Sequence, residues 1–430
     1  MSSRLQEGIY YRAKPPIGSS FCVLSLRAES TSRIEDIGRT IREIWDHLTY
    51  LKKGITVDLE IDSRHRKIGN LTVLLAYSSK FFELPGSKKT RPSSFSDSWN
   101  FRPPAPDGGG PIAEGSGMTY SPRTFENHLL NDHLLFQFIA DGEFYTKRAC
   151  VEVWKALHKF EKKTGHSNLR IMGIYPGFQR PDRRNWLGFH DGVSNLKSHE
   201  RLHVISVDSR YLNGRDKWTA EGTYLAFMRT GLDLEKWEDI PVTLQEISIG
   251  REKLTGCPLI RVDKNKNPIK DSRCPVPGTS EVTDRGNEYF REHPPYGIRT
   301  EDRILEQSHI GSTRPIDRLP AWDKRSMLIF RQGFEFLISS KESPGFVAGL
   351  NFVSFQNTPE RLFSALTYRH KLAQKNSQLL TTAPNLENFM SVFAAGIFFV
   401  PPFARNEPFP GANILFNMSK IRNRDNYNYI

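Results

Sequence analysis

The chain has 430 residues, which is long enough for two hydrophobic cores of ordinary size. A hydrophobic content of 38% and an aromatic content of 11%, with 28 Phe, exclude an intrinsically disordered protein. The formal net charge is +12, but Lys and Arg are scattered among Asp and Glu without a long basic block. We therefore expect a solvated surface and no nucleic-acid partner.

Four cysteines lie far apart in the sequence, and none forms a CxxC pair: Cys22, Cys150, Cys257 and Cys274. This spacing is not typical of a zinc or iron–sulfur site, and we expect reduced thiols. The N-terminus MSSRLQEGIYYRAK has no apolar core of the kind that a signal peptide needs, and no apolar run approaches the length of a membrane span. The sequence therefore predicts a cytoplasmic protein without a membrane partner.

The first half of the chain predicts a β-α-β-β pattern followed by further elements. Apolar residues at three-and-four spacing from Ile34 to Leu51 indicate a helix, which a capping box of Ser32 and Glu35 begins and Gly54 ends. The stretch from about 83 to 125 is dense in Pro, Gly and Ser and predicts a long surface loop or insertion. In chain order we expect a strand at 20–26, a helix at 34–51, strands at 55–61, 71–77 and 133–140, a helix at 147–164 and a strand at 169–175.

The second half repeats this plan. We expect a strand at 223–229, a helix around 234–251, a polar irregular region at 262–325, strands at 326–337 and 347–355, a helix opening at Thr358 and Pro359, and a strand at 396–400. The pattern predicts an α+β fold of two tandem ferredoxin-like domains, in which helices cover antiparallel sheets. We place the N-terminal domain at 1–190 and the C-terminal domain at 191–430.

Two polar residues stand in segments with an ordinary explanation. Asp191 lies in the turn GFHDGVSN (188–195), where Gly188 and Gly192 could supply positive φ and the carboxylate an Asx hydrogen bond. His309 lies in SHIGSTRP, and a lone histidine is more often a surface or packing residue than a ligand. Neither residue alone predicts a function.

Arg331 is harder to explain by packing alone. Met327, Ile329 and Arg331 share one face of the predicted strand at period two, which places a guanidinium among apolar neighbours. Such a charge is costly without an anionic partner unless the strand lies at an edge.

The order and spacing of Asp191, His309 and Arg331 resemble the dye-decolorizing peroxidase family. In that family a GxxDG turn carries the distal acid, a downstream HI segment carries the proximal haem ligand, and an Arg after a strand completes the distal side. Collinear matches cover most of the chain, from LQEGIYY and HLLFQFIADG through GTYLAFMR and IGREKLTGCPL to GLNFVSFQ and AGIFFVPP.

The resemblance implies tandem ferredoxin-like domains of the dimeric α+β barrel superfamily, haem b as cofactor, and 191–430 as the haem-binding domain. It also implies reduction of hydrogen peroxide and one-electron oxidation of aromatic or dye-like donors. By resemblance, the residues against the haem are Gly192, Val193 and Ser194, and Arg314 lies near a propionate. A Gly and a Ser follow His309–Ile310, where relatives often carry a basic residue, and this departure bears on the propionate contacts.

The same resemblance assigns roles. Asp191 would take a proton from one peroxide oxygen and deliver it to the other, and Arg331 would stabilise the developing charge and lower the pKa of the aspartate. His309 would be the axial iron ligand, with Glu360 or Glu387 accepting from its other ring nitrogen.

Several alternatives stay open. His190 is a rival for the base, although its side chain should point away from that of Asp191. Trp99, Trp186, Trp218 and Trp322 lie in polar, loop-like sequence and could relay electrons, whereas Trp45 and Trp154 lie on apolar helical faces and are interpreted as core.

Other functions are also open. The chain could carry haem or release its iron without peroxidase turnover, and self-association is undecided. An RNA-binding ferredoxin-like protein is disfavoured, because AGLNFVSF (348–355) has Ala348 in place of a basic residue and Leu350 in place of a stacking aromatic.

Overall fold

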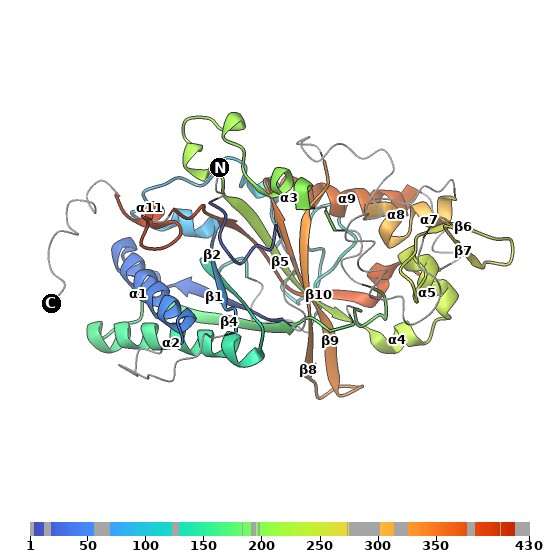
Figure 1. The fold of residues 1–430 in the computed structure, drawn as a ribbon, viewed down its shortest axis with the longest axis horizontal. Coiled ribbons are helices and arrows are strands. Elements are labelled where there is room, and N and C mark those ends of the chain that lie inside the picture. Colours follow the sequence, from blue (N-terminus) through green and yellow to red (C-terminus); the bar gives the residue numbers. More distant parts are fainter. Residues whose placement is uncertain are drawn as a thin grey trace.

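The computed structural model describes residues 4–12, 19–55, 69–122, 129–182, 184–190, 195–196, 198–272, 274, 302–313, 326–375, 383–404 and 406–417. Within these residues, eight strands close into a barrel in the order β1-β3-β2-β10-β5-β9-β8-β4 (Figure 1). The barrel strands are β1 Ser20–Ala28, β2 Thr72–Ser78, β3 Leu134–Ala140, β4 Leu169–Phe178, β5 Thr223–Leu232, β8 Phe330–Ser339, β9 Phe346–Gln356 and β10 Met390–Val400. A separate hairpin pairs β6 Leu259–Val262 with β7 Pro268–Lys270.

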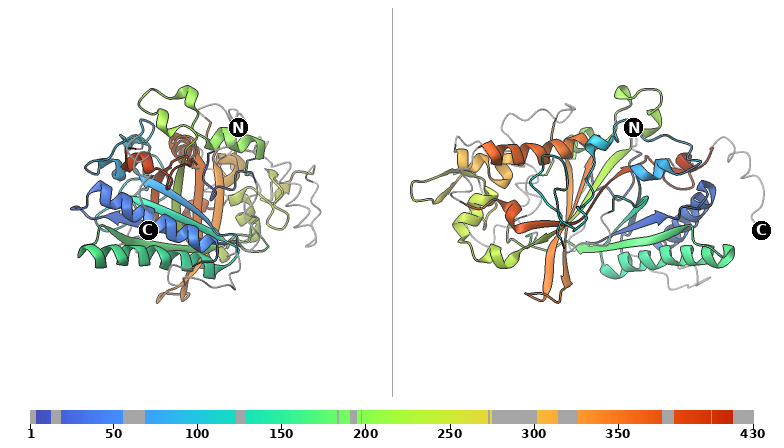
Figure 2. Two further views of the ribbon diagram at one scale, coloured as in Figure 1. Left: turned by 60° about the vertical axis from the view of Figure 1, so that its left-hand side comes forward. Right: turned by 180° about the vertical axis from the view of Figure 1, so that it is seen from behind.

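Most of the α-helices lie toward the two ends of the molecule (Figure 1). Figure 1 shows α1 and α2 at one end and α4, α5, α7, α8 and α9 at the other, and the view from behind in Figure 2 agrees. The α-helices are α1 Ile34–Lys52, α2 Glu143–Thr164, α3 Ser198–Ile205, α4 Leu234–Glu238, α5 Val242–Ile249, α7 Arg303–Glu306, α8 His309–Thr313, α9 Glu360–Lys375 and α11 Ala412–Leu415. The short 3-10 helices are η1 Ser79–Glu83, η2 Asp97–Trp99, η3 Ser209–Tyr211, η4 Lys217–Thr219 and η5 Leu386–Phe389.

The strand order shows the same unit twice. The strands of the first half run β4-β1-β3-β2, and those of the second run β10-β5-β9-β8, so each set has the order fourth, first, third, second. This is the arrangement of a β-α-β-β-α-β ferredoxin-like unit. The predicted α+β fold with ferredoxin-like sheets is confirmed, and the domain boundary at 190/191 remains a prediction.

The two sheets meet at short seams. β10 pairs with β2 at Phe398↔Ser78 and Phe399↔Tyr77, and β4 pairs with β8 at Phe178↔Glu335. At the first seam the Gln6 side chain donates to the Leu75 and Pro401 carbonyls, at 2.9 and 3.0 Å, and accepts from the Leu75 amide. A buried glutamine thus supplies backbone-like hydrogen bonds where the strands diverge.

Alternation along the strands separates the cores. Phe21 and Val23 of β1 point into the barrel, whereas Cys22 and Leu24 pack against α1 and α2 outside it. A third cluster covers the outer face of the second sheet, beneath α9 and the segment around 95–120. Each fully buried large apolar side chain stabilises the fold by about 1.5–3 kcal/mol.

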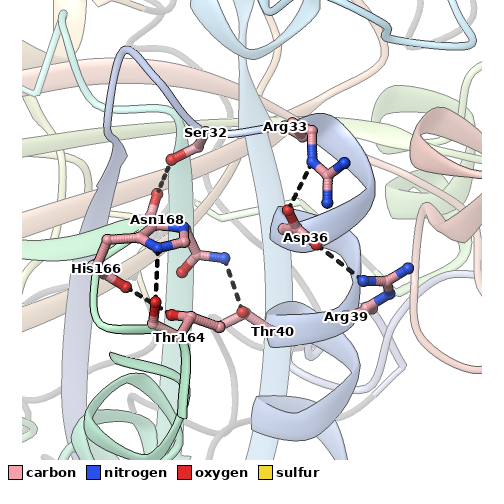
Figure 3. Close-up of polar contacts among 8 residues, drawn as sticks. All are labelled: Ser32, Arg33, Asp36, Arg39, Thr40, Thr164, His166 and Asn168. Carbon is pink, nitrogen blue, oxygen red and sulfur yellow. Dashed lines mark hydrogen bonds and ion pairs between the residues drawn. The ribbon is translucent and has the colours of Figure 1, made fainter. Parts of the chain in front are cut away.

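The predicted capping box at α1 is wrong. The helix begins after Arg33, with no side-chain cap, and Ser32 Oγ instead donates to the Asn168 carbonyl at 3.0 Å (Figure 3). Asn168 Nδ2 in turn donates to Thr40 Oγ1 at 2.8 Å. Ser32 is used to join the start of α1 to the start of β4, so it is not available to cap the helix.

The segment at 83–125, expected to be a long surface loop or insertion, is irregular in the part that the structure describes, but it is packed rather than free of the core. The segment has little regular structure but buries apolar side chains against the outer face of the second sheet. These apolar residues are widely spaced among Pro, Gly and Ser, so the sequence shows no periodic pattern that would predict a packed layer. These side chains are Phe95, Phe101, Ile112, Met118 and Tyr120.

Smaller differences have local causes. The helix expected at 234–251 divides into α4 and α5, because Pro241 cannot continue a helix. The strand expected at 326–337 begins at Phe330. Nearly all of the strand expected at 55–61 lies outside the described residues, and no helix among the described residues is both long and apolar enough to cross a membrane.

The expectation of four reduced thiols is wrong for two of them. Cys257 and Cys274 form a disulfide, because the β6–β7 hairpin brings residues 17 apart in sequence back together. Cys22 and Cys150 are free and buried, with their sulfurs 3.6 Å apart. The cysteine argument for a cytoplasmic location therefore fails, and the location itself remains a prediction.

Candidate active site

Arg331 lies on the outer face of the second sheet. Its neighbours Phe330 and Phe334 point into the barrel, so Arg331 points the other way, and the register places it opposite Ser354 of β9. On this face Leu362 and Phe363 of α9 pack against the sheet. Arg331 is half-buried as a residue, and its Nε atom is buried.

His309 is the first residue of α8, which packs against α9 and α7 on the same side of the molecule. The next residue, Ile310, is buried in a cluster that includes Phe189 from the segment leading into Asp191. The helix of His309 and the segment before Asp191 therefore meet in one apolar cluster, although 120 residues separate His309 from Phe189.

The departure after His309–Ile310 has a steric explanation. A Cβ atom on Gly311 would lie 2.1 Å from the carbonyl oxygen of Leu305, because α7 and α8 approach closely there. A larger side chain, basic or otherwise, cannot be accommodated at this position without moving the two helices apart.

Most of the predicted Asp191 turn lies outside the described residues. Asp191, Gly192, Val193, Ser194 and, further along, Arg314 are not described, so their roles remain predictions. The acceptor for the second ring nitrogen of His309 also remains a prediction, with the described residues Glu360 and Glu387 as candidates.

Asn195, at the end of this turn, is described, and it is bonded to Arg331. Asn195 Nδ2 donates to the Arg331 carbonyl at 2.6 Å, and the Arg331 amide donates to Asn195 Oδ1 at 3.2 Å. The chain leaving the Asp191 turn is thereby fixed to the backbone of Arg331. Sequence reasoning missed this role for Asn195, although the residue belongs to the GFHDGVSN motif.

His190 is buried, and its environment disfavours the protonated imidazole. Burial, and next the positive charge of Arg184, lower the pKa of His190 from its ordinary 6.5 to about 4. The ring is therefore neutral near neutral pH and takes up a proton poorly. This weakens the case for His190 as the base and leaves Asp191 as the better candidate.

Arg251 is a site residue that the sequence interpretation missed. It is only 3% exposed, and its Nη1 donates to the Gly256 carbonyl at 2.6 Å. Burial, and then the charge of Arg331, lower the pKa of Arg251 to about 9. Two guanidinium groups are thus close enough to interact, which creates a positive potential suited to an anion. The residue stands in the IGREKLTGCPL match, but the polar sequence around it is typical of a surface.

The described residues fit a haem group. Several apolar side chains remain partly exposed although they pack against the cluster on the outer face of the second sheet: Ile329, Phe352, Leu366 and Met390. A porphyrin needs an apolar surface, an imidazole to bind iron and cations for its anionic groups. This side of the second half supplies the surface, with His309 and the pair Arg331 and Arg251.

Comparisons with known proteins agree with the fold. A solved structure of ferric DtpA from Streptomyces lividans matches with a TM-score of 0.63 and 21% identity, covering 95% of each chain. The DyP-type peroxidase from Cellulomonas bogoriensis matches with a TM-score of 0.63 and 17% identity, covering 94% of each chain. At these identities the likeness shows the fold.

The sequence relatives match only about half of this chain. A deferrochelatase from Escherichia coli K12 is 24% identical over 244 residues, which are 55% of this chain and 46% of that protein. The chain therefore spans about half the length of the curated relatives that it matches. A family model described as Dyp-type peroxidase, C-terminal, matches residues 182–405, a range that contains the GFHDGVSN segment, His309 and Arg331. Because that range holds slightly more than half of the 430 residues, the chain belongs to the Dyp-type peroxidase family, a family of haem-dependent enzymes.

Proposed function

We propose that the chain is a haem b peroxidase that reduces hydrogen peroxide and oxidises aromatic or dye-like donors in one-electron steps. The observation that carries the proposal is the pair of hydrogen bonds by which Asn195 fixes the turn of Asp191 to the backbone of Arg331. This link supports an acid/base group and a cation on the same side of the cofactor. His309 begins α8, which Figure 1 shows beside α7 and α9.

In this proposal His309 binds the iron, and Gly192, Val193 and Ser194 lie against the porphyrin. Arg314 contacts a propionate. The bound haem supplies the redox chemistry, since it accepts two oxidising equivalents from peroxide and returns them singly.

The residues on the distal side manage protons and charge. The Asp191 carboxylate takes a proton from one oxygen of hydrogen peroxide and returns it to the other, so that water leaves. Arg331 stabilises the negative charge that builds as the O–O bond lengthens, and Arg251 adds to the same field. As the resemblance implies, Arg331 would also favour the ionised form of Asp191.

Bulky donors cannot reach a buried cofactor, so an aromatic side chain near the surface must pass on electrons. Trp186 is the best supported of the four candidates. It is half-buried, its ring meets that of the partly exposed Phe178 at 6.0 Å, and it precedes Asp191 by five residues. Trp322 lies outside the described residues, and Trp99 and Trp218 pack against the outer cluster.

The prediction that Trp154 is core is wrong. Its side chain is 52% exposed, because it lies on the face of α2 that points away from the first sheet, where its ring stacks on that of His158. Trp45 packs partly buried against the core under α1, as expected.

The decisive experiment is stopped-flow mixing of the haem-loaded protein with hydrogen peroxide. We expect a fast change in the Soret band for the native protein and a rate at least 100-fold lower for Asp191→Asn, with haem binding retained. Equal rates for the two proteins would refute the assignment of Asp191.

A second candidate is release of iron from haem, or carriage of haem, without turnover. It is favoured by the matched protein from Escherichia coli, which is named a deferrochelatase. Incubation with haem and a reductant separates the two: porphyrin free of iron would support release, whereas oxidation of a dye that depends on peroxide supports the peroxidase.

RNA binding has little support. The aromatic left at a stacking position, Phe352 of β9, is partly buried and packs against the cluster on the outer face of the second sheet. Self-association and a cytoplasmic location remain predictions.

A further inference from the structure

A loop at residues 250–258 lies against the segment before Asp191. Gly250 and Gly256 hold left-handed conformations, with φ of 87° and 74°, and the amides of Gly256 and Glu252 bond across the loop to the carbonyls of Glu252 and Cys257, both at 2.9 Å. The Cys257–Cys274 disulfide joins this loop to the end of the β6–β7 hairpin. Backbone and covalent bonds together close the loop.

One arginine connects this loop to the segment before Asp191. Arg184 Nη1 donates to the carbonyls of Gly188 and Lys253, and its Nη2 donates to the carbonyl of Leu254, all at 2.7 Å. The approach is close: a Cβ atom on Gly188 would lie 2.4 Å from Lys253 Cε, and Gly188 has φ of 87°. Carbonyls from two separate segments are therefore held by a single guanidinium.

The same loop carries Arg251. Arg251 Nη1 donates to the Gly256 carbonyl, which immediately precedes Cys257. The disulfide, the loop, Arg251 and the segment Asn185–His190 therefore form one contiguous unit. Breaking the disulfide would therefore disturb both Arg251 and the segment that leads into Asp191.

We propose that Arg184 is a positioning residue for the peroxide reaction, and that it acts through the 250–258 loop which the Cys257–Cys274 disulfide closes. The inference rests on the proposed function. Arg184 does not contact the reacting atoms; it holds the Gly188 carbonyl and the loop of Arg251 in a fixed relation. Reduction of the disulfide by a dithiol loosens that loop and slows the reaction.

The reduction step is balanced. Dithiothreitol supplies two electrons and two protons: its two thiols become a cyclic disulfide, the Cys257–Cys274 bond breaks, and each sulfur becomes a thiol. Cys22 and Cys150 are already thiols and do not change.

The test uses the haem-loaded full chain and measures the second-order rate constant with hydrogen peroxide beside the Soret band of the resting protein. We expect Arg184→Gln and Cys274→Ser each to lower the rate constant about tenfold with the Soret band unchanged, since small displacements of reacting groups slow reactions strongly. Arg184→Lys recovers part of the rate, because an ammonium can reach one or two of the three carbonyls. Dithiothreitol slows the native protein to the rate of Cys274→Ser.

Matched controls keep the outcome specific. Arg215→Gln removes an arginine that joins two other segments, through Thr90 Oγ1 at 2.9 Å and the Arg91 carbonyl at 3.0 Å, and it keeps the native rate. Cys150→Ser retains both the native rate and its sensitivity to dithiothreitol. Native rates in Arg184→Gln and in the reduced protein would overturn the inference, as would losses that follow haem loss alone. A native protein that fails to react with peroxide would instead overturn the proposed function.

Discussion

The hydrogen bonds between Asn195 and Arg331 predict a specific cost for Asn195→Ala. The change removes the donor to the Arg331 carbonyl and the acceptor for the Arg331 amide. A hydrogen bond contributes about 0.5–1.5 kcal/mol net, so the two together stabilise the fold by about 1–3 kcal/mol. We expect the free energy of unfolding in urea to fall by that amount.

The same substitution should also slow the reaction with peroxide, because it frees the turn of Asp191 from the strand of Arg331. A displacement of about 1 Å can cost up to about 100-fold in rate, so a loss of tenfold or more is expected in stopped-flow measurements. Asn168→Ala serves as the control, since its Nδ2 makes a buried hydrogen bond to Thr40 far from the site. It should lose stability without losing rate. If Asn195→Ala lost stability alone, the link between turn and strand would have no part in catalysis.

Three further predictions concern stability, packing and electron transfer. Because the pKa of His190 is lowered from 6.5 to about 4, its contribution to stability is present above pH 6.5 and is lost as the pH falls toward 4. Urea unfolding of His190→Gln should therefore vary less between pH 7 and 4 than that of the native protein, by up to about 3 kcal/mol, and parallel curves would contradict this. Gly311→Ala should cost about 1–3 kcal/mol by forcing α7 and α8 apart, as thermal unfolding would show, and an unchanged midpoint would argue against the close approach. Trp186→Phe should slow steady-state oxidation of bulky dyes while the stopped-flow rate with peroxide stays native; undiminished dye turnover would rule out Trp186 as the relay.

The regular elements were predictable because each carries a clear period. The apolar spacing of α1 and the alternation along β8 are properties of neighbouring residues, so the sequence alone identifies them. The start of α1 was not predictable from the sequence, because Ser32 donates a hydrogen bond to the carbonyl of Asn168, which lies 136 residues away. The Cys257–Cys274 pairing likewise depends on a hairpin that the sequence did not reveal.

The candidate site divides in the same way. His309 and Arg331 could be singled out because a motif and an unusual charge in a strand indicate them. Arg184 and Arg251 could not, since both stand in polar sequence and their importance comes from carbonyls of other segments. Sequence patterns identify residues of unusual chemistry; residues that hold backbone in place become visible only in the fold.

The assignment of His309 as the iron ligand is tested most directly by the absorption spectrum of His309→Ala after loading with haem. We predict that the variant loses the native Soret band, and that added imidazole restores it by occupying the vacated position. A variant with the native spectrum in the absence of imidazole would contradict the account.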